Sequence, residues 1–145
     1  MRAAYFLDTN ILLYRASTAE VELPKRRIAE NLLRRTDIGL SAQVLAEFYH
    51  NAVHKPGLRM PAATARTIVE ALAILPVVPI TAGLVLAAIE IRDRYQISYW
   101  DAAIVAAARE LSATTVFSED LNHGQIYDGI TIQNPFLPGA AHSMA

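Results

Sequence analysis

Ala3-Ala4-Tyr5-Phe6-Leu7-Asp8 (residues 3–8) is a short apolar run that contains two aromatic side chains and ends at a carboxylate. Such a run is typical of a short buried strand. Similar runs occupy residues 38–40, 114–117 and 130–132, and Val77-Val78, which lies between two prolines, predicts at most a short strand. The chain therefore carries several short strands, spread along its whole length.

Stretches with helical character separate these strands. Ser41 and Thr81 are suitable N-caps, and Pro61 suits the first position of a helix. Short strands that alternate with helices predict βαβ units, and so one α/β domain with a short, mostly parallel sheet and helices on both faces. The expected helices span residues 23–35, 41–54, 61–72, 81–95 and the alanine-rich stretch 99–111.

The composition limits the possible functions. The 145 residues fit one domain, and a hydrophobic content of 53% favours a folded globule. A net charge of -1 means that a nucleic acid would have to be held by local basic residues or by bound metal. The absence of cysteine excludes disulfides, thiolate metal sites and cysteine nucleophiles.

No apolar stretch approaches the ~20 residues that a membrane-spanning helix needs. Asp8 and Asn10 interrupt the first apolar run, which argues against a signal peptide. We therefore expect a cytoplasmic protein without a membrane segment, and a small, polar, flexible tail over residues 138–145.

Four acidic residues stand at places where an α/β fold can gather them. Asp8 and Asp120 follow predicted strands, and groups just past the carboxyl ends of parallel strands face the ligand-binding crevice. Asp101 opens the alanine-rich helix, and Glu47 lies in mid-helix beside apolar neighbours. Each also has a simpler explanation, because a first-turn Asp often caps or stabilises its helix and a mid-helix Glu is usually solvated.

A shared pocket would change the chemistry of these acids. Carboxylates held close together repel one another, so that a pKa rises or a cation binds. Oxygen ligands alone suit Mg²⁺ or Mn²⁺, which keep several water molecules and bridge to phosphate oxygens. Such an ion activates a bound water and stabilises the transition state of phosphodiester hydrolysis.

The same segments resemble a known family. Their order and spacing are similar to those of PIN-domain nucleases over about residues 4–136, and single-domain proteins of this length most resemble VapC-type toxins of bacterial toxin–antitoxin pairs. The segments that carry the resemblance are Phe6-Leu7-Asp8-Thr9-Asn10-Ile11-Leu12-Leu13-Tyr14, Ala42-Gln43-Val44-Leu45-Ala46-Glu47-Phe48, Ser98-Tyr99-Trp100-Asp101-Ala102-Ala103, Phe117-Ser118-Glu119-Asp120-Leu121 and Ile132-Gln133-Asn134-Pro135-Phe136.

The resemblance implies a PIN-like, Rossmann-like three-layer sandwich over residues 1–137 that hydrolyses RNA with Mg²⁺ or Mn²⁺. It further implies a homodimer and a cognate antitoxin, bound in an apolar groove between the helices at 23–35 and 41–54. An antitoxin arginine that reaches the acids is a hypothesis, tested by whether the neighbouring gene's product co-purifies. The matching catalytic and metal-binding residues are Asp8, Glu47, Asp101 and Asp120, and the supporting polar residues are Thr9, Asn10 and Ser118.

One position departs from the family pattern. Many members carry another acid about three residues after the position of Asp120, where this chain has His123. The fourth ligand is therefore either Asp120 or, as the weaker choice, Glu119.

Other side chains offer competing chemistry. His50 and His54 are spaced i, i+4 on one helical face, but the HExxH pattern of zinc proteases is absent. The arginine-rich stretch 26–35 either contacts phosphates or forms a solvated helix face. Trp100 either stacks on a base or packs on its own helix.

Two functions from other classes compete with the nuclease. A receiver-type phosphoacceptor also uses acids at strand ends with Mg²⁺, but it needs a Lys after a late strand, and no Lys follows Lys55. A catalytically silent PIN-like module for RNA binding or assembly is the stronger alternative. Within the enzyme class, the basic residues do not distinguish RNA from DNA.

Overall fold

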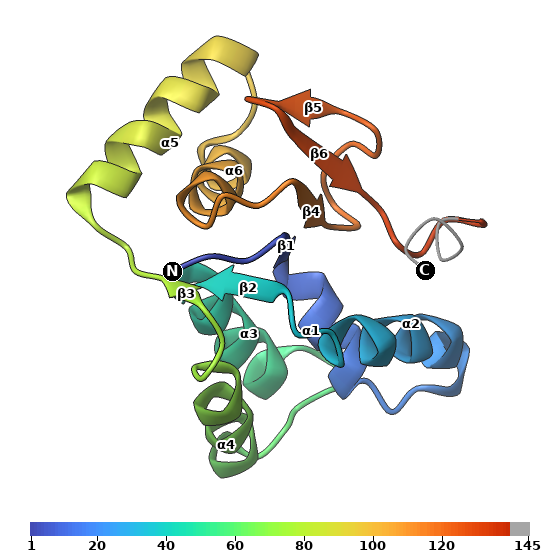
Figure 1. Cartoon of the computed structure of the whole chain (residues 1–145). Helices are drawn as coiled ribbons and strands as arrows, with labels where there is room; N and C mark the ends of the chain where they lie inside the picture. Colours follow the sequence, from blue (N-terminus) through green and yellow to red (C-terminus); the bar gives the residue numbers. More distant parts are fainter. Residues whose placement is uncertain (140–145) are drawn as a thin grey trace.

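The computed structural model of the chain describes residues 1–139 and confirms the predicted α/β architecture. Within these residues the strands form one six-stranded sheet in the order β3-β2-β1-β4-β6-β5 (Figure 1). Neighbouring strands pair in parallel, except for the antiparallel pair of β5 and β6. The strands are β1 (Tyr5–Leu7), β2 (Ile38–Ser41), β3 (Val77–Val78), β4 (Thr115–Phe117), β5 (Ile126–Tyr127) and β6 (Ile130–Gln133).

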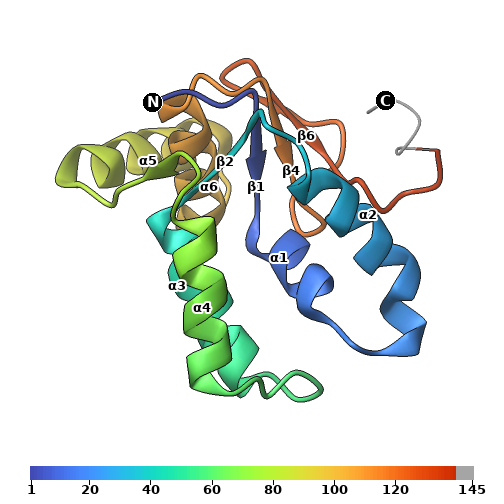
Figure 2. The same ribbon diagram turned by 60° about the horizontal axis from the view of Figure 1, so that its bottom comes forward.

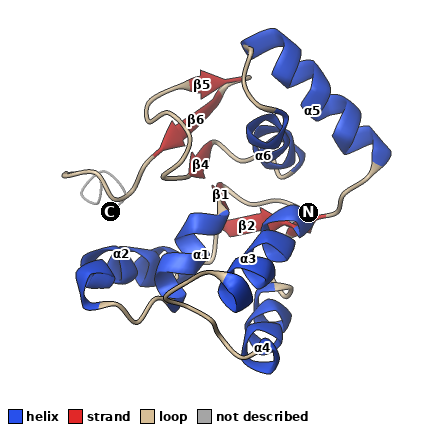
Figure 3. Cartoon of the chain, turned by 180° about the vertical axis from the view of Figure 1, so that it is seen from behind, coloured by secondary structure: helices blue, strands red, loops and turns tan. Residues whose placement is uncertain are grey.

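The helices form a layer on each side of the sheet. Helices α1 to α4 lie on one side, and α5 and α6 lie on the other (Figures 1 and 3). The three-layer sandwich is therefore as expected. The helices are α1 (Thr9–Ala16), α2 (Leu23–Leu33), α3 (Ala42–His54), α4 (Ala62–Leu72), α5 (Ala82–Tyr95) and α6 (Tyr99–Glu110), with a short 3-10 helix, η1 (Glu20–Glu22), before α2.

The central strand β1 is buried on both faces. Its consecutive residues Phe6 and Leu7 are fully buried and belong to different apolar clusters, one that includes α6 and one with Ile11 and Ala29. This follows from the alternation of side chains along a strand. Helix α6 is buried over seven consecutive residues, 102–108, and its alanines let it lie close between the sheet and α5.

Helix α1 is not among the elements expected from the sequence. It begins at once after β1, beside the end of β4 (Figure 2). The Asp8 carboxylate caps it by accepting a hydrogen bond from the Thr9 N–H at 2.7 Å, and Ile11 and Leu12 are buried. The capping role considered for Asp8 is thus present, and the helix that it caps carries Thr9 and Asn10.

The hairpin that β5 forms with β6 was also not expected from the sequence, although the strand β6 itself was. Its turn is Asp128-Gly129, and both residues have positive φ, 51° and 82°. The Asp128 carboxylate accepts hydrogen bonds from Tyr95 and from the guanidinium groups of Arg94 and Arg109, at 2.6–2.9 Å. These contacts fasten the hairpin to α5 and α6.

Residues 140–145 of the expected flexible tail lie outside the described residues, so that expectation stays a prediction, as does the boundary at residue 137. No helix among residues 1–139 has both the length and the apolar character needed to cross a membrane.

Candidate active site

Asp8 lies at the junction of β1 and α1. Its backbone N–H continues the parallel pairing by donating to the Phe117 carbonyl of β4 at 3.0 Å. Its side chain is buried, with 6% of the residue exposed, and its second oxygen accepts a hydrogen bond from the Ser118 Oγ at 2.7 Å. The two central strands therefore bring Asp8 and Ser118 together, 110 residues apart in the sequence.

Glu47 reaches the same region from α3. One of its oxygens accepts a hydrogen bond from the Thr9 Oγ1 at 2.9 Å, and the other accepts from the Gln43 Nε2 one turn earlier, also at 2.9 Å. These two hydrogen bonds orient the half-buried Glu47 side chain from both sides.

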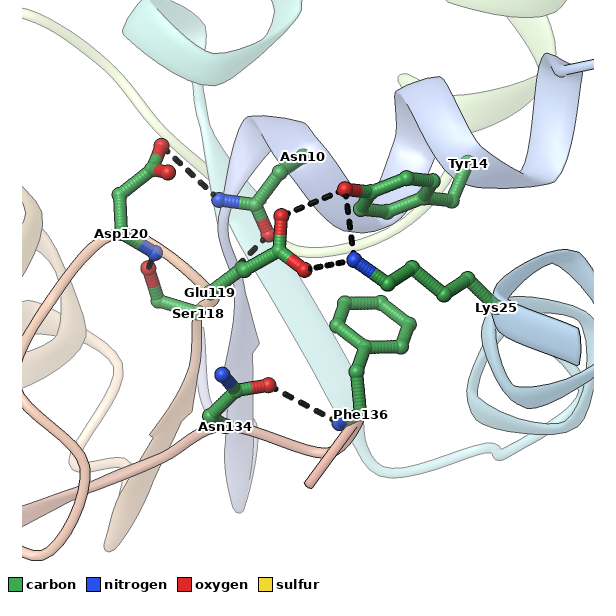
Figure 4. Close-up of polar contacts among 8 residues, drawn as sticks. All are labelled: Asn10, Tyr14, Lys25, Ser118, Glu119, Asp120, Asn134 and Phe136. Atoms are coloured by element: carbon green, nitrogen blue, oxygen red, sulfur yellow. Dashed lines mark hydrogen bonds and ion pairs between the residues drawn. The ribbon is translucent and has the colours of Figure 1, made fainter. Parts of the chain in front are cut away.

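Asp120 reaches this region from the loop after β4. Its Oδ2 accepts a hydrogen bond from the Asn10 Nδ2 at 3.1 Å, and its N–H donates to the Ser118 Oγ at 3.2 Å (Figure 4). Each of the three predicted supporting residues thus donates to a different acid: Ser118 to Asp8, Thr9 to Glu47, and Asn10 to Asp120.

A cleft of about 550 Å³ opens beside these residues. Its wall combines carboxylates with polar, basic and apolar side chains, and the loop 55–58 closes one side. The polar and charged residues of the lining include Thr9, Asn10, Tyr14, Glu47, Asn51, Lys55, Glu119 and Asp120. The cleft lies at the carboxyl ends of β1 and β4, where the sequence placed the ligand site.

The electrostatics of the site centre on Asp8. Burial raises the pKa of Asp8 from 3.8 to about 6, against the hydrogen bonds from Ser118 and the Thr9 N–H, which lower it. The charges of Asp120 and Glu47 raise the pKa further. A carboxyl group in this position favours either a proton or a cation nearby.

Asp101 is placed differently from the other three acids. It lies in the first turn of α6, where its N–H donates to the Ser98 Oγ at 3.1 Å, and, like Asp8, it is not among the residues that line the cleft. Burial raises the pKa of Tyr127, and the negative charge of Asp101 raises it further. The hydrogen bonds of the described residues therefore connect Asp8, Glu47 and Asp120 through their supporting residues, and Asp101 takes part in none of these bonds.

Glu119 makes contacts away from the other acids. Its Oε1 accepts from the Tyr14 hydroxyl and its Oε2 from the Lys25 Nζ, both at 2.5 Å (Figure 4). Burial disfavours the charged form, but the hydrogen bonds from Lys25 and Tyr14 outweigh it, so the pKa of Glu119 is lowered. Because the Lys25 ammonium already pairs with its charge, Glu119 is the poorer candidate for a fourth metal ligand.

The donor set fits a hard divalent cation in its chemistry. It consists of carboxylates, one of them buried, and Mg²⁺ and Mn²⁺ prefer oxygen ligands. As arranged in residues 1–139, no three acidic or histidine side chains converge closely enough to enclose an ion. The histidine pair also falls short of a three-ligand site, although the His50 and His54 rings lie 4.7 Å apart.

Several residues of the cleft were not foreseen. Tyr14 lies one turn after Asn10 on the unpredicted helix α1, and Asn51 lies one turn after Glu47 on α3. The i, i+4 spacing from a candidate residue is the signal that would have pointed to both. Lys25 became visible only through the fold, because it contacts Glu119 across 94 residues of sequence.

Comparisons with solved structures agree with this fold. The chain is similar to the Mycobacterium tuberculosis toxin VapC20, a sarcin-ricin loop cleaving toxin, with 23% identity, 80% of this chain and 91% of that chain covered, and a TM-score of 0.63. A toxin–antitoxin complex from Klebsiella pneumoniae matches with 18% identity and a TM-score of 0.66, and the match covers 88% of this chain and 95% of that chain. VapBC2 from Rickettsia felis, bound to promoter DNA, matches with 18% identity and a TM-score of 0.62, and the match covers 89% of this chain and 96% of that chain.

A comparison with curated protein sequences gave no match. The family model of the PIN domain, however, matches residues 5–129, which include the sheet up to the β5–β6 turn and all four predicted acids. The chain therefore belongs to the PIN domain family.

Proposed function

We propose that the protein is an endoribonuclease that depends on Mg²⁺ or Mn²⁺. The observation that carries the proposal is the buried Asp8 carboxylate, which hydrogen bonds connect through Thr9 and Ser118 to Glu47 and Asp120, two acids that line a polar cleft. A fold that maintains such a costly group needs a compensating function for it, and metal binding is the function that its oxygen donors suit.

Asp8, Glu47 and Asp120 are the residues that would hold the ion, with Asp101 contributing from the first turn of α6. The bound ion supplies an activated water and stabilises the charge that develops on the phosphodiester. Ser118, Thr9 and Asn10 each fix the orientation of one carboxylate by a hydrogen bond of 2.7–3.1 Å. Metal binding would bring these carboxylates closer together, because no three acids among residues 1–139 enclose an ion as they are arranged.

RNA is the substrate that we propose. The similarity to a sarcin-ricin loop cleaving toxin supports it, and the cleft offers Lys55 as a positive charge near the acids. A chain of net charge -1 binds a polyanion through such local charges and through metal, not through its overall charge.

A protein antitoxin is the partner that we propose. An apolar pocket of about 230 Å³ between α1, α2, α3 and α4 suits an apolar segment of such a partner. Two of the similar structures are toxin–antitoxin or VapBC assemblies, which supports this choice. The residues that line the pocket are Leu12, Arg15, Ala16, Leu33, Phe48, Ile68 and Leu72.

We also propose that the protein forms a homodimer and acts in the cytoplasm.

The test is an RNA cleavage assay in which only the metal changes. End-labelled structured RNAs are incubated with the purified protein in Mg²⁺, in Mn²⁺, and with a chelator. We expect discrete cleavage products with either ion, none with the chelator, and recovery when the ion is restored in excess.

The contrary outcome would be RNA binding without cleavage in any of these ions. That outcome favours a catalytically silent RNA-binding module. Single-stranded DNA of the same sequence shows in parallel whether the activity distinguishes the two nucleic acids.

A further inference from the structure

Side chains from α1, α2, the loop after β4 and the segment after β6 meet around Lys25 (Figure 4). Two of them, Tyr14 and Glu119, line the cleft. Lys25 from α2 donates to the Glu119 Oε2 at 2.5 Å and to the Tyr14 hydroxyl at 3.1 Å. Tyr14 from α1 donates in turn to the Glu119 Oε1 at 2.5 Å. Each of the three side chains thus contacts the other two, and we call this cluster the Tyr14–Lys25–Glu119 latch.

Aromatic rings hold the ammonium group of the latch in place. The Lys25 Nζ lies 4.7 Å from the centre of the Tyr14 ring and 5.6 Å from that of Phe136, which follows β6. The two rings pack edge to face with centres 4.9 Å apart. The side chains of Lys25 and Glu119 are 39% and 26% exposed, so the latch is a partly buried ion pair that two aromatic rings flank.

The latch includes a residue of the loop that carries Asp120. Glu119 is the residue directly before Asp120, and its N–H donates to the Asn10 Oδ1 at 3.2 Å. The other end of the same Asn10 side chain donates to the Asp120 Oδ2 at 3.1 Å. Ser118, on the other side of Glu119, donates to Asp8. A shift of Glu119 would therefore move two residues of the proposed metal site.

We propose that Lys25 and Tyr14 are positioning residues that act through Glu119 to keep the loop 118–120, and with it Asp120, beside Asp8 for metal binding. The inference rests on the proposed function, because it concerns the same site. It assigns to Glu119 a role as the anchor of its loop, in place of a role as a metal ligand. Removing a group that orients a metal ligand commonly lowers metal affinity by about 10–100-fold.

The test measures Mn²⁺ affinity without RNA, by titration with electron paramagnetic resonance detection, in the full chain and its variants. Lys25→Met removes the ammonium group and keeps most of the stem, whereas Tyr14→Phe removes only a hydroxyl. We expect about 10-fold weaker Mn²⁺ binding in Lys25→Met, a smaller loss in Tyr14→Phe, and near wild-type affinity in Lys25→Arg.

Glu30→Gln is the matched control on the same helix. Glu30 pairs with Arg15 of α1 at 3.8 Å and contacts none of the loop 118–120. We expect its affinity for Mn²⁺ to stay at the wild-type value. Thermal melts identify any variant that unfolds, and Tyr14→Phe then carries the test, because it leaves the ion pair intact.

A kinetic measurement separates positioning from direct RNA contact. If the latch positions the loop, Lys25→Met lowers kcat and raises the Mn²⁺ concentration needed, while KM for RNA stays the same at saturating metal. Unchanged Mn²⁺ affinity in a folded Lys25→Met, or a rise in KM alone, overturns the latch. Absence of Mn²⁺ binding by the wild-type protein overturns the proposed function instead.

Discussion

Asp8→Asn is expected to reduce metal-dependent RNA cleavage at least about 100-fold, more than the loss of a supporting residue. Asp8 is the acid shared by the whole arrangement, because the charges of Glu47 and Asp120 act on it and Ser118 orients it. An amide in its place keeps the shape and can still accept from the Thr9 N–H, but it lacks the charge that binds a cation. The measurement is the initial rate of cleavage of a labelled RNA at saturating Mg²⁺.

Asp93→Asn provides the control for this prediction. Asp93 is an exposed carboxylate on α5 that pairs with Arg92, so its loss removes one negative charge far from the cleft. We expect its cleavage rate to equal that of the wild-type protein. Equal rates in all three proteins would show that the cleavage comes from a contaminant or from another site.

The same Asp8→Asn substitution is expected to stabilise the metal-free protein near neutral pH. A folded-state pKa of about 6 in place of 3.8 corresponds to a cost of about 3 kcal/mol for keeping Asp8 charged, at roughly 1.4 kcal/mol for each pH unit. Asn carries no such cost, and it caps a helix about as well as Asp. The predicted gain in the free energy of unfolding is therefore about 2–3 kcal/mol at about pH 8.

The sign of the pH dependence follows from proton binding. Between about pH 4 and 6 the unfolded chain has lost the Asp8 proton and the folded chain still holds it, so the wild-type protein loses stability as the pH rises. Below this window both states are protonated, and above it the full cost is present. The advantage of Asp8→Asn should hence be greatest above pH 6 and vanish near pH 4.

Urea unfolding in the presence of a chelator at several pH values measures this difference. Adding Mg²⁺ at about pH 8 should then stabilise the wild-type protein and leave Asp8→Asn unchanged, because only the charged carboxylate gains from the ion. An Asp8→Asn protein that is less stable than wild type at every pH would contradict a costly buried charge at this position.

The sequence predicted those parts of the fold whose local pattern agrees with their burial. The strands at 38–40, 114–117 and 130–132 and the helices beginning after Ser41 and Thr81 are present because apolar periodicity and capping residues act locally. The Asp128-Gly129 pair, whose residues both have positive φ, is a sequence signal for the β5–β6 hairpin. Helix α1 follows β1 with no intervening loop, so the apolar run gave no sign of a change in period.

The site was predictable in its residue types more than in its geometry. Strand ends located Asp8 and Asp120 near each other, since parallel neighbours place their carboxyl ends together. The distances from the acids to Thr9, Asn10 and Ser118 depend on how α1 and the loop after β4 pack, which no local pattern encodes. The contact of Lys25 with Glu119 arises from the same long-range packing.

An anomalous difference map from crystals grown with Mn²⁺ is the decisive measurement for the proposed metal site, because it locates the ion without reference to activity. We expect a peak bounded by the Asp8 carboxylate and at least one of Glu47, Asp101 and Asp120, and no such peak in Asp8→Asn crystals. A peak confined to another place, such as the His50–His54 pair, or a cleft without any peak at saturating Mn²⁺, would contradict it.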